Sequence, residues 1–211
     1  LYLVIISIAI AIFSACISLA IMDGVNVLPK RLKWLRIVFA GIAFATGVWS
    51  MHFIGMLAVK LPMPLAYSPS ITFVSYLFSI AGAVPAMALI NLGKKTTQHQ
   101  MSASTLLATA ICIMHYSGMA SMRMQPAIIY DPVWVVISIL IAFTASYIGL
   151  NIVTLWRSDH KKSKRLFYSA GGVLGVAVSA MHYAGMNAAY FVPNSISLAV
   201  IDKGLMDDHL A

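Results

Sequence analysis

Six long apolar segments run through this sequence, and they limit what the chain can fold into more than any other feature does. The segments cover about residues 1–22, 35–59, 70–92, 104–124, 132–156 and 166–192. Each is near or above the ~20 residues that an α-helix needs to cross about 30 Å of hydrocarbon. A soluble chain of 211 residues could not bury the apolar surface of a composition that is 61% hydrophobic and 9% charged. We therefore predict an all-α membrane protein with six transmembrane helices.

Basic residues mark every second connection between these segments. Eleven of the fourteen lysines and arginines lie in three alternate connections: Lys30, Arg31, Lys33, Arg36, Lys94, Lys95, Arg157, Lys161, Lys162, Lys164 and Arg165. The other connections hold only Lys60 and Arg123, and Lys203 lies in the tail. Because basic loops stay on the cytoplasmic side, we predict that these three connections are cytoplasmic and that the N-terminus lies outside. Membrane topology thus explains the net charge of +8, and no nucleic-acid partner is needed. The alternative role for these basic residues is a binding site for anionic lipid or a protein partner.

A six-residue motif that contains a histidine occurs three times. It reads MHFIGM at 51–56, MHYSGM at 114–119 and MHYAGM at 181–186. The histidines are 63 and 67 residues apart, and each lies in the second segment of a pair. Three matches at nearly regular spacing indicate internal duplication rather than chance.

Weaker echoes support the duplication. The tripeptides FSA at 13–15, FSI at 78–80 and FTA at 143–145 precede the motif histidines by 37 to 39 residues. We therefore expect residues 1–193 to form three repeated helix pairs, at about 1–62, 63–126 and 127–193. Residues 194–211 would then be a short tail.

The residues that follow each motif place the three histidines at one depth. Lys60 and Arg123 each follow a motif histidine by eight residues, and a proline follows each by ten or eleven, at Pro62, Pro126 and Pro193. If proline ends these helices, a rise of 1.5 Å per residue puts the histidines about 12–16 Å below the outer helix ends. The three motif helices run in the same direction. We therefore predict one three-ligand site on a pseudo-threefold axis, in the outer half of the membrane.

Each motif surrounds its histidine with three other kinds of side chain. On a helix, the methionine at i+4 and the glycine at i+3 share the histidine's face, whereas the leading methionine is rotated by about 100°. The glycine would allow close approach of helices, and the aromatic residue would form a wall of the site. The predicted metal-site residues are His52, His115, His182, Met56, Met119, Met186, Met51, Met114 and Met181; the packing glycines are Gly55, Gly118 and Gly185; the walls are Phe53, Tyr116 and Tyr183.

A histidine in hydrocarbon is costly unless its ring nitrogens are satisfied, and such residues usually serve function. Three imidazoles at one depth would suit zinc, copper, iron or nickel. Added thioethers favour copper, above all Cu(I), because soft sulfur ligands select soft metals. The alternatives are that each histidine bonds a hydroxyl or carbonyl across helices, and that the methionines only fill space.

The triple motif on alternate helices closely resembles the MHYT domain, a bacterial integral-membrane sensor module. The resemblance covers residues 1 to about 193. It implies a copper site, Cu(I) or Cu(II), built from the motif histidines and methionines near the outer membrane face. It also implies detection of a diatomic gas (O2, CO or NO) or a redox cue, and a fused or associated cytoplasmic signalling domain, often one that makes or degrades cyclic-di-GMP. The chain departs from the family motif at Phe53, which stands where the family has tyrosine. It departs again at Ile54, Ser117 and Ala184, which stand where the family has threonine, so a role for the threonine hydroxyl is not expected.

On this basis we expect a multi-pass protein of the bacterial inner membrane that is not itself an enzyme. The sequence is also compatible with a homo-oligomer. The tail is too short and too charged to cross the membrane, so we expect a seventh helix and an output domain to lie beyond this chain.

Three alternatives remain at the level of sequence. An intramembrane hydrolase with zinc on three histidines would need a general acid or base, but the six acidic residues lie in predicted connections, near helix ends or in the tail. A copper or zinc transporter would need ligands along a path, and the other histidines, His99 and His160, fall in connections. Haem held by two histidines lacks a covalent attachment motif. Cys16 and Cys112 lie in separate predicted helices and suggest neither a disulfide nor a metal motif.

Overall fold

The computed structural model describes residues 1–59, 66–92, 96–125, 127–158, 163–192 and 196–197. Within these residues the long helices are α1 (Tyr2–Met22), α2 (Lys30–Met56), α3 (Pro69–Leu92), α4 (Thr97–Ala120), α5 (Pro132–Ser158) and α6 (Lys164–Ala188), and a short 3-10 helix, η1, spans Val25–Val27. Each of the six long helices is long and apolar enough to cross a membrane. The prediction of an all-α membrane protein with six spanning helices is confirmed.

The motif helices begin earlier than their apolar segments do. Helix α2 starts at Lys30 and α4 at Thr97, whereas the segments start at about residues 35 and 104. In α2 the added turns contain lysine and arginine, which are good helix formers and whose long side chains can hold the charge away from hydrocarbon. In α4 the helix begins after Thr96, whose side chain accepts a hydrogen bond from the backbone amide of His99 and caps the helix. Arg36, which was expected in the first connection, lies within α2 and donates from Nη1 to the backbone carbonyl of Asp23 at 2.8 Å.

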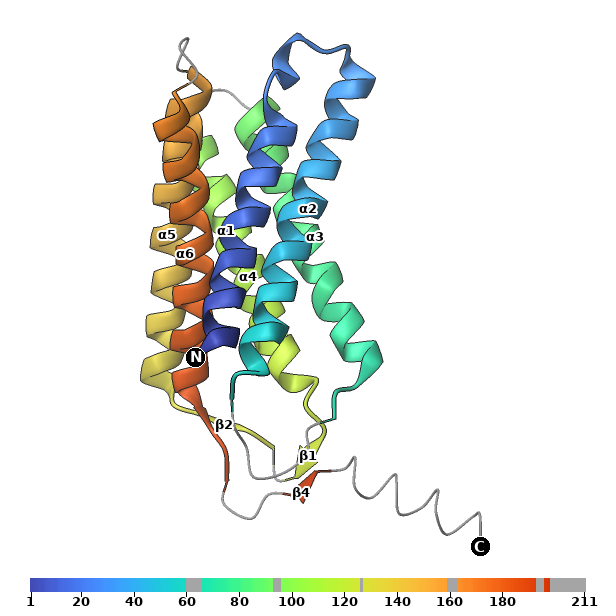
Figure 1. Cartoon of the computed structure of the whole chain (residues 1–211), viewed down its shortest axis with the longest axis vertical. Coiled ribbons are helices and arrows are strands. Elements are labelled where there is room, and N and C mark those ends of the chain that lie inside the picture. Colours follow the sequence, from blue (N-terminus) through green and yellow to red (C-terminus); the bar gives the residue numbers. More distant parts are fainter. Residues whose placement is uncertain (60–65, 93–95, 126, 159–162, 193–195, 198–211) are drawn as a thin grey trace, which may run out of the picture.

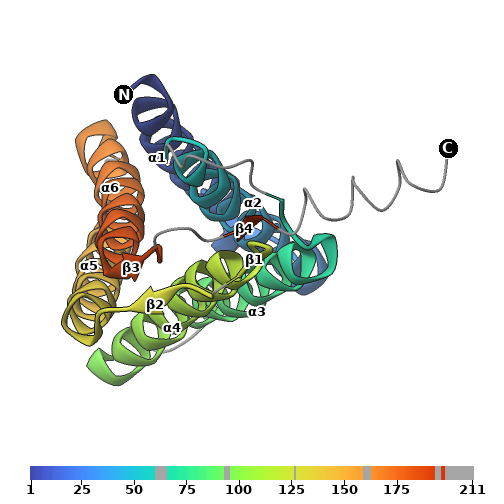
Figure 2. The ribbon, with the colours of Figure 1, turned by 90° about the horizontal axis from the view of Figure 1, so that it is seen from below.

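Three helical hairpins form a closed ring. The pairs α1–α2, α3–α4 and α5–α6 each pack along their length, and every second helix also packs on the first helix of the next pair. Helix α6 packs on α1, so the last helix closes the ring on the first (Figure 2). The motif helices α2, α4 and α6 meet one another inside this ring, and the basic ends of the helices lie at the opposite end from the motifs (Figure 1).

The three inner helices present matching residues at matching offsets from their histidines. Because the histidines meet at one level, residues at the same offset lie at about the same depth in the bundle, and each such set of three is called a layer here. Every member of the layers eight, four and one residues before the histidines is at most 3% exposed: Phe44, Leu107 and Leu174; Val48, Ile111 and Val178; Met51, Met114 and Met181. The nine side chains of these layers, on the basic side of the histidines, are therefore all buried and apolar.

Four two-residue strands tie together the segments at the motif end. Strand β1 (Met124–Gln125) pairs with β4 (Ile196–Ser197), and β2 (Ile129–Tyr130) pairs with β3 (Ala189–Tyr190), both antiparallel. An isolated bridge joins Tyr67 to Met122. The segments that follow α2, α4 and α6 are thereby held together across this end of the bundle (Figure 1).

The histidines lie closer to the helix ends than we predicted. Helices α2, α4 and α6 end at Met56, Ala120 and Ala188, only four to six residues after their histidines. At 1.5 Å per residue this is about 6–9 Å, so the range of 12–16 Å was wrong. The cause is that the helices end well before the prolines, and Lys60, Pro62, Pro126 and Pro193 lie outside the described residues.

Close contact between α1 and α6 depends on glycine. A Cβ atom built on Gly175 would lie 2.5 Å from the backbone Cα and N atoms of Ile12, whereas a Cβ on Gly172 would meet nothing within 4 Å. Small residues allow such approach in membranes, where dispersion contacts between helices carry much of the stability.

We expect Gly175→Ala to lower the stability of the folded chain in detergent by about 1–3 kcal/mol, because α1 must move away from α6. Gly172→Ala is the matched control and should be neutral or slightly stabilising, since alanine is the better helix former. Thermal unfolding followed by circular dichroism measures both. Equal midpoints for the two variants would contradict the packing described for α1 and α6.

Candidate metal centre

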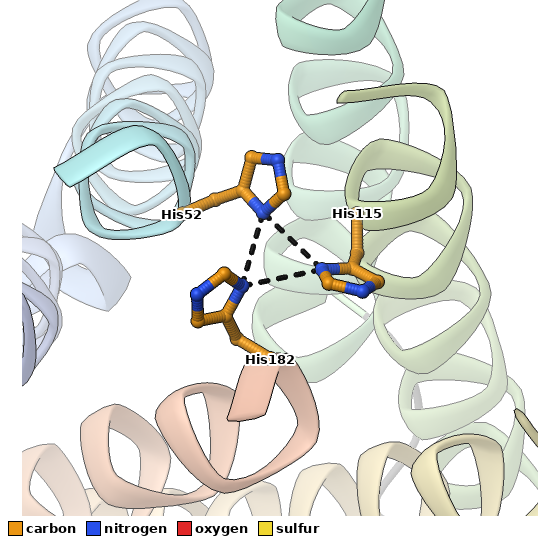
Figure 3. A group of neighbouring side chains, drawn as sticks. All are labelled: His52, His115 and His182. Carbon is orange, nitrogen blue, oxygen red and sulfur yellow. Dashed lines mark hydrogen bonds between the residues drawn. The ribbon is translucent and has the colours of Figure 1, made fainter. Parts of the chain in front are cut away.

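The three motif histidines meet on the axis of the bundle. The Nδ1 atom of His52 lies 3.1 Å from that of His182 and 3.2 Å from that of His115, and the His115 and His182 Nδ1 atoms are 3.2 Å apart (Figure 3). The rings are 0–1% exposed and are nearly perpendicular to one another, with interplanar angles of 81–86°. Three nitrogens from three helices therefore form one buried, nearly equilateral triangle.

Hydrogen bonding among the histidines cannot satisfy this triangle. A neutral imidazole carries either a proton or a lone pair on Nδ1, never both. Two Nδ1 atoms can therefore form a hydrogen bond only when one is protonated and the other carries a lone pair. With three atoms in a ring, at least one contact must join two donors or two acceptors. At the Nδ1 atoms, the described residues place each imidazole against the other two rather than against a hydroxyl or carbonyl.

The triangle has dimensions that suit a cation bound to all three nitrogens. Nitrogen ligands about 2.0–2.1 Å from zinc lie about 3.3–3.4 Å apart in a tetrahedral arrangement and about 3.5–3.6 Å apart in a trigonal plane. The observed distances of 3.1–3.2 Å are within a few tenths of an ångström of these values. His52, His115 and His182 are the only group of metal-binding character that the described residues form from histidine, cysteine or carboxylate side chains.

The motif glycines accommodate the opposite edges of the imidazole rings. A Cβ on Gly55 would lie 2.5 Å from Nε2 of His182, and Cβ atoms on Gly118 and Gly185 would overlap Nε2 of His52 and His115. Each glycine thus makes room for the ring from another motif helix, which is more specific than the general helix approach we predicted. Within the described part of the chain, none of these three Nε2 atoms has a hydrogen-bond partner.

Each histidine ring packs edge-on against the aromatic residue that follows it. The ring centroids are 4.8 Å apart in all three pairs, His52–Phe53, His115–Tyr116 and His182–Tyr183. Each of these aromatic rings therefore lies directly against one imidazole of the triangle.

The two tyrosine hydroxyls are directed to serines on neighbouring outer helices. Tyr116 Oη lies 2.7 Å from Ser138 Oγ on α5, and Tyr183 Oη lies 2.8 Å from Ser7 Oγ on α1. Both serine hydroxyls already donate to a backbone carbonyl, that of Val135 or Val4, at 2.7–2.8 Å. The serines must therefore accept, so each tyrosine donates its proton to a serine and has none left to donate to a ligand at the triad.

Phe53 lacks this hydroxyl, and Trp49 takes its place. The indole Nε1 of Trp49 donates to Ser75 Oγ on α3 at 3.2 Å, and the Trp49 ring lies 4.9 Å from that of Phe53. Ser75 also donates to a carbonyl, that of Thr72. We did not predict these serines, yet a signal exists: Ser75 and Ser138 each follow a motif histidine by 23 residues, and the circular order of the helices brings Ser7 to Tyr183.

The methionines of the motif lie in two separate layers. Met51, Met114 and Met181 belong to the main apolar core, on the basic side of the histidines. Met56, Met119 and Met186 belong to a second cluster at the motif end. The two sets therefore lie on opposite sides of the triangle, as their positions before and after the histidine in each helix require.

Other candidate residues lie away from the triangle. Asp131 stands just before α5, where one carboxylate oxygen accepts from the Val133 amide at 2.8 Å. His99 is in the first turn of α4 and contacts Thr96 Oγ1 at 2.7 Å, and His160 lies outside the described residues. Both cysteine thiols are free. Burial and the nearby Tyr116 raise the pKa of Tyr130 to about 12, so this phenol above the site is neutral at physiological pH.

The fold and the triangle define a membrane protein with a buried three-histidine centre on the axis of a helical ring. The family MHYT, described as a bacterial signalling protein N terminal repeat, matches residues 46–104 and 109–164. The chain belongs to this family. The matched units start 63 residues apart, the same interval that separates His52 from His115, and the third motif copy lies beyond them.

Similar proteins carry signalling names. The chain is 37% identical over 209 residues to the bifunctional diguanylate cyclase/cyclic di-GMP phosphodiesterase MucR of Pseudomonas aeruginosa, covering 96% of this chain and 30% of that protein. It is 30% identical to the signaling protein YkoW of Bacillus subtilis, over 90% and 24% of the two chains. It is 31% identical to the cyclic di-GMP phosphodiesterase NbdA of P. aeruginosa, over 76% and 20%. The chain thus spans less than a third of these relatives, and no solved structure matches it.

We expect Tyr116→Phe to destabilise the chain by about 0.5–1.5 kcal/mol, since it removes the hydrogen bond to Ser138, and Ser138→Ala to cost at least as much, since it removes that bond and the one to the Val135 carbonyl. The double variant should cost clearly less than the sum of the two single changes, because both remove the same bond. Tyr168→Phe, at a 64% exposed side chain, is the control and should have no effect. Unfolding free energies in detergent test this, and strictly additive losses would contradict the contact between Tyr116 and Ser138.

Proposed function

We propose that this chain is the membrane sensor module of a bacterial signalling protein and that His52, His115 and His182 together hold one copper ion. In this account, a change of redox state at the copper, or a diatomic gas such as O2, CO or NO, alters helix packing and regulates a cytoplasmic output. The observation that carries the proposal is the triangle of Nδ1 atoms. A cation would satisfy all three lone pairs at once, which no set of tautomers achieves.

Charge and ligand softness favour Cu(I) over Zn(II). Three neutral imidazoles and neutral thioethers add no negative charge, so a bound Zn(II) would keep two positive charges in a dry interior and Cu(I) only one. The layer of Met56, Met119 and Met186, one turn from the histidines, offers a soft ligand for a fourth position. Bound copper would supply a redox couple and a coordination position for a small neutral ligand.

The contacts around the histidines suggest how the site could influence the rest of the bundle. A shift of an imidazole ring presses on its neighbouring aromatic residue, and through Tyr116, Tyr183 or Trp49 on a serine of an outer helix. The outer helices α1, α3 and α5 run the length of the bundle to its basic end. We place this end on the cytoplasmic side of the inner membrane, where a fused domain of the kind named in MucR or NbdA would receive the signal.

The alternatives are less well supported by the described residues. A zinc hydrolase needs a general acid or base near the metal, and Asp131, the acidic residue described at the motif end, caps α5 instead. A transporter needs ligands beyond the histidines, but the layers of Phe44, Leu107 and Leu174 and of Val48, Ile111 and Val178 offer none.

Metal analysis of the purified chain tests the shared site. We expect the wild type to bind one copper per chain, and His52→Ala, His115→Ala and His182→Ala each to lose at least 90% of it at a fixed competing chelator concentration. His99→Ala is the matched control and should keep the wild-type content. Unchanged copper in all three motif variants would overturn the proposal, and zinc with esterase or amidase turnover would favour a hydrolase.

A second prediction concerns the fit of the rings. Gly118→Ala should lower copper affinity at least tenfold, because the new Cβ would overlap Nε2 of His52 and push that ring out of the triangle. Gly172→Ala adds a methyl group to open space and should bind copper as the wild type does. Competition with a chromogenic Cu(I) chelator measures both. Equal affinities would show that the triangle does not hold the copper.

A further inference from the structure

Five methionines form a compact group at the motif end of the bundle. The second buried cluster contains Met56, Met119, Met122 and Met124, each at most 8% exposed, with Met186 packed against them. We call this set the thioether cap. Three of its members end the sequence motifs, whereas Met122 and Met124 lie beyond α4 in a segment outside any motif.

The backbone holds Met122 and Met124 in place over the site. The amide of Met122 donates to the carbonyl of Met119 at 3.1 Å, and Met122 also forms the bridge to Tyr67. Met124 begins strand β1, which pairs with β4. A connection at the end of a membrane helix is normally polar, yet this one buries two thioethers at 8% and 6% exposure beside the motif methionines.

The two sides of the histidine triangle differ in what they offer to a metal ion. On the basic side, the residues four and eight positions before the histidines are only valine, isoleucine, leucine and phenylalanine. The motif helices also carry the thiol of Cys112 and the buried hydroxyls of Ser104 and Ser179 on this side, but the described residues form no group of thioethers there beyond the leading methionines. On the motif side, the described cluster has thioethers, with phenylalanine, tyrosine, isoleucine and alanine around them and no carboxylate or thiol. An ion that reaches the triangle from the motif side therefore passes among thioethers, which bind soft monovalent cations and discriminate against hard ones.

We propose that the thioether cap is a second, soft-metal site, which binds Cu(I) more weakly than the histidine triangle does and passes it to the triangle by ligand exchange. The binding step depends on the cap alone, while the transfer step rests on the proposed copper site. Exchange between neutral sulfur and neutral nitrogen ligands moves a single charge without proton or electron transfer. The cap thus sets which metal reaches the triangle.

The binding step can be tested with Ag(I), a closed-shell analogue of Cu(I), and the full chain labelled at its methionine methyl carbons in nanodiscs. On addition of one equivalent of Ag(I) to copper-loaded protein, we expect the methyl signals of the cap to shift. The signal of Met87, which is 1% exposed in the main core, should not move. If the Met122 and Met124 signals stay in place, these methionines are packing residues only and the proposal is overturned, whatever the histidines bind.

The transfer step can be tested by loading kinetics. The variant Met122→Leu/Met124→Leu conserves volume and removes two thioethers, so the fold should survive. We expect Cu(I) transfer from a chelator to the triangle to become at least tenfold slower, with an unchanged final content of one copper at the histidines. Met87→Leu is the matched control and should load at the wild-type rate. A double variant that loads as fast as this control would overturn the proposal, whereas failure of the wild type to load copper at the histidines would overturn the copper site instead.

Discussion

Three imidazole nitrogens face one another across the axis of this bundle, and an odd ring of such atoms cannot pair by hydrogen bonds alone. The rest of the architecture serves this convergence. Three hairpins close into a ring so that α2, α4 and α6 meet inside it, and a glycine on each inner helix leaves room for a neighbouring histidine. A polar group left unsatisfied in hydrocarbon is expensive, so the arrangement has a cost that a bound cation would offset.

The three imidazoles have similar neighbours, an aromatic ring and a hydrogen-bonded serine, at similar positions around the triangle. Aromatic rings fix the imidazoles from the outside, and serines on the outer helices fix those aromatic groups in turn. In the first repeat the same serine position is kept, while Trp49 supplies the donor that Phe53 lacks. A hydrogen bond to a serine of an outer helix is thus present beside each of the three histidines, although its donor is tryptophan in one case and tyrosine in the other two.

Much of the fold and the central site could be predicted from the sequence. Transmembrane helices can be predicted from long apolar runs alone. The regular spacing of the motif predicts that His52, His115 and His182 lie at one depth. The depth was wrong because helix ends depend on local backbone bonding and not on the next proline. The contact of Tyr183 with Ser7 could not be predicted from the sequence, because the sequence does not show that α6 packs on α1. Met122 and Met124 gave no periodic signal, since they lie outside helices and are buried only by the bridge and the strands at the motif end.

X-ray absorption at the copper edge tests the central claim most directly. The chain in nanodiscs would be loaded with one equivalent of Cu(I) and its first coordination shell measured. The account predicts three imidazole nitrogens at about 2.0 Å, with the multiple-scattering pattern of three rings. A shell made only of sulfur, or one that contains a single imidazole, would contradict it.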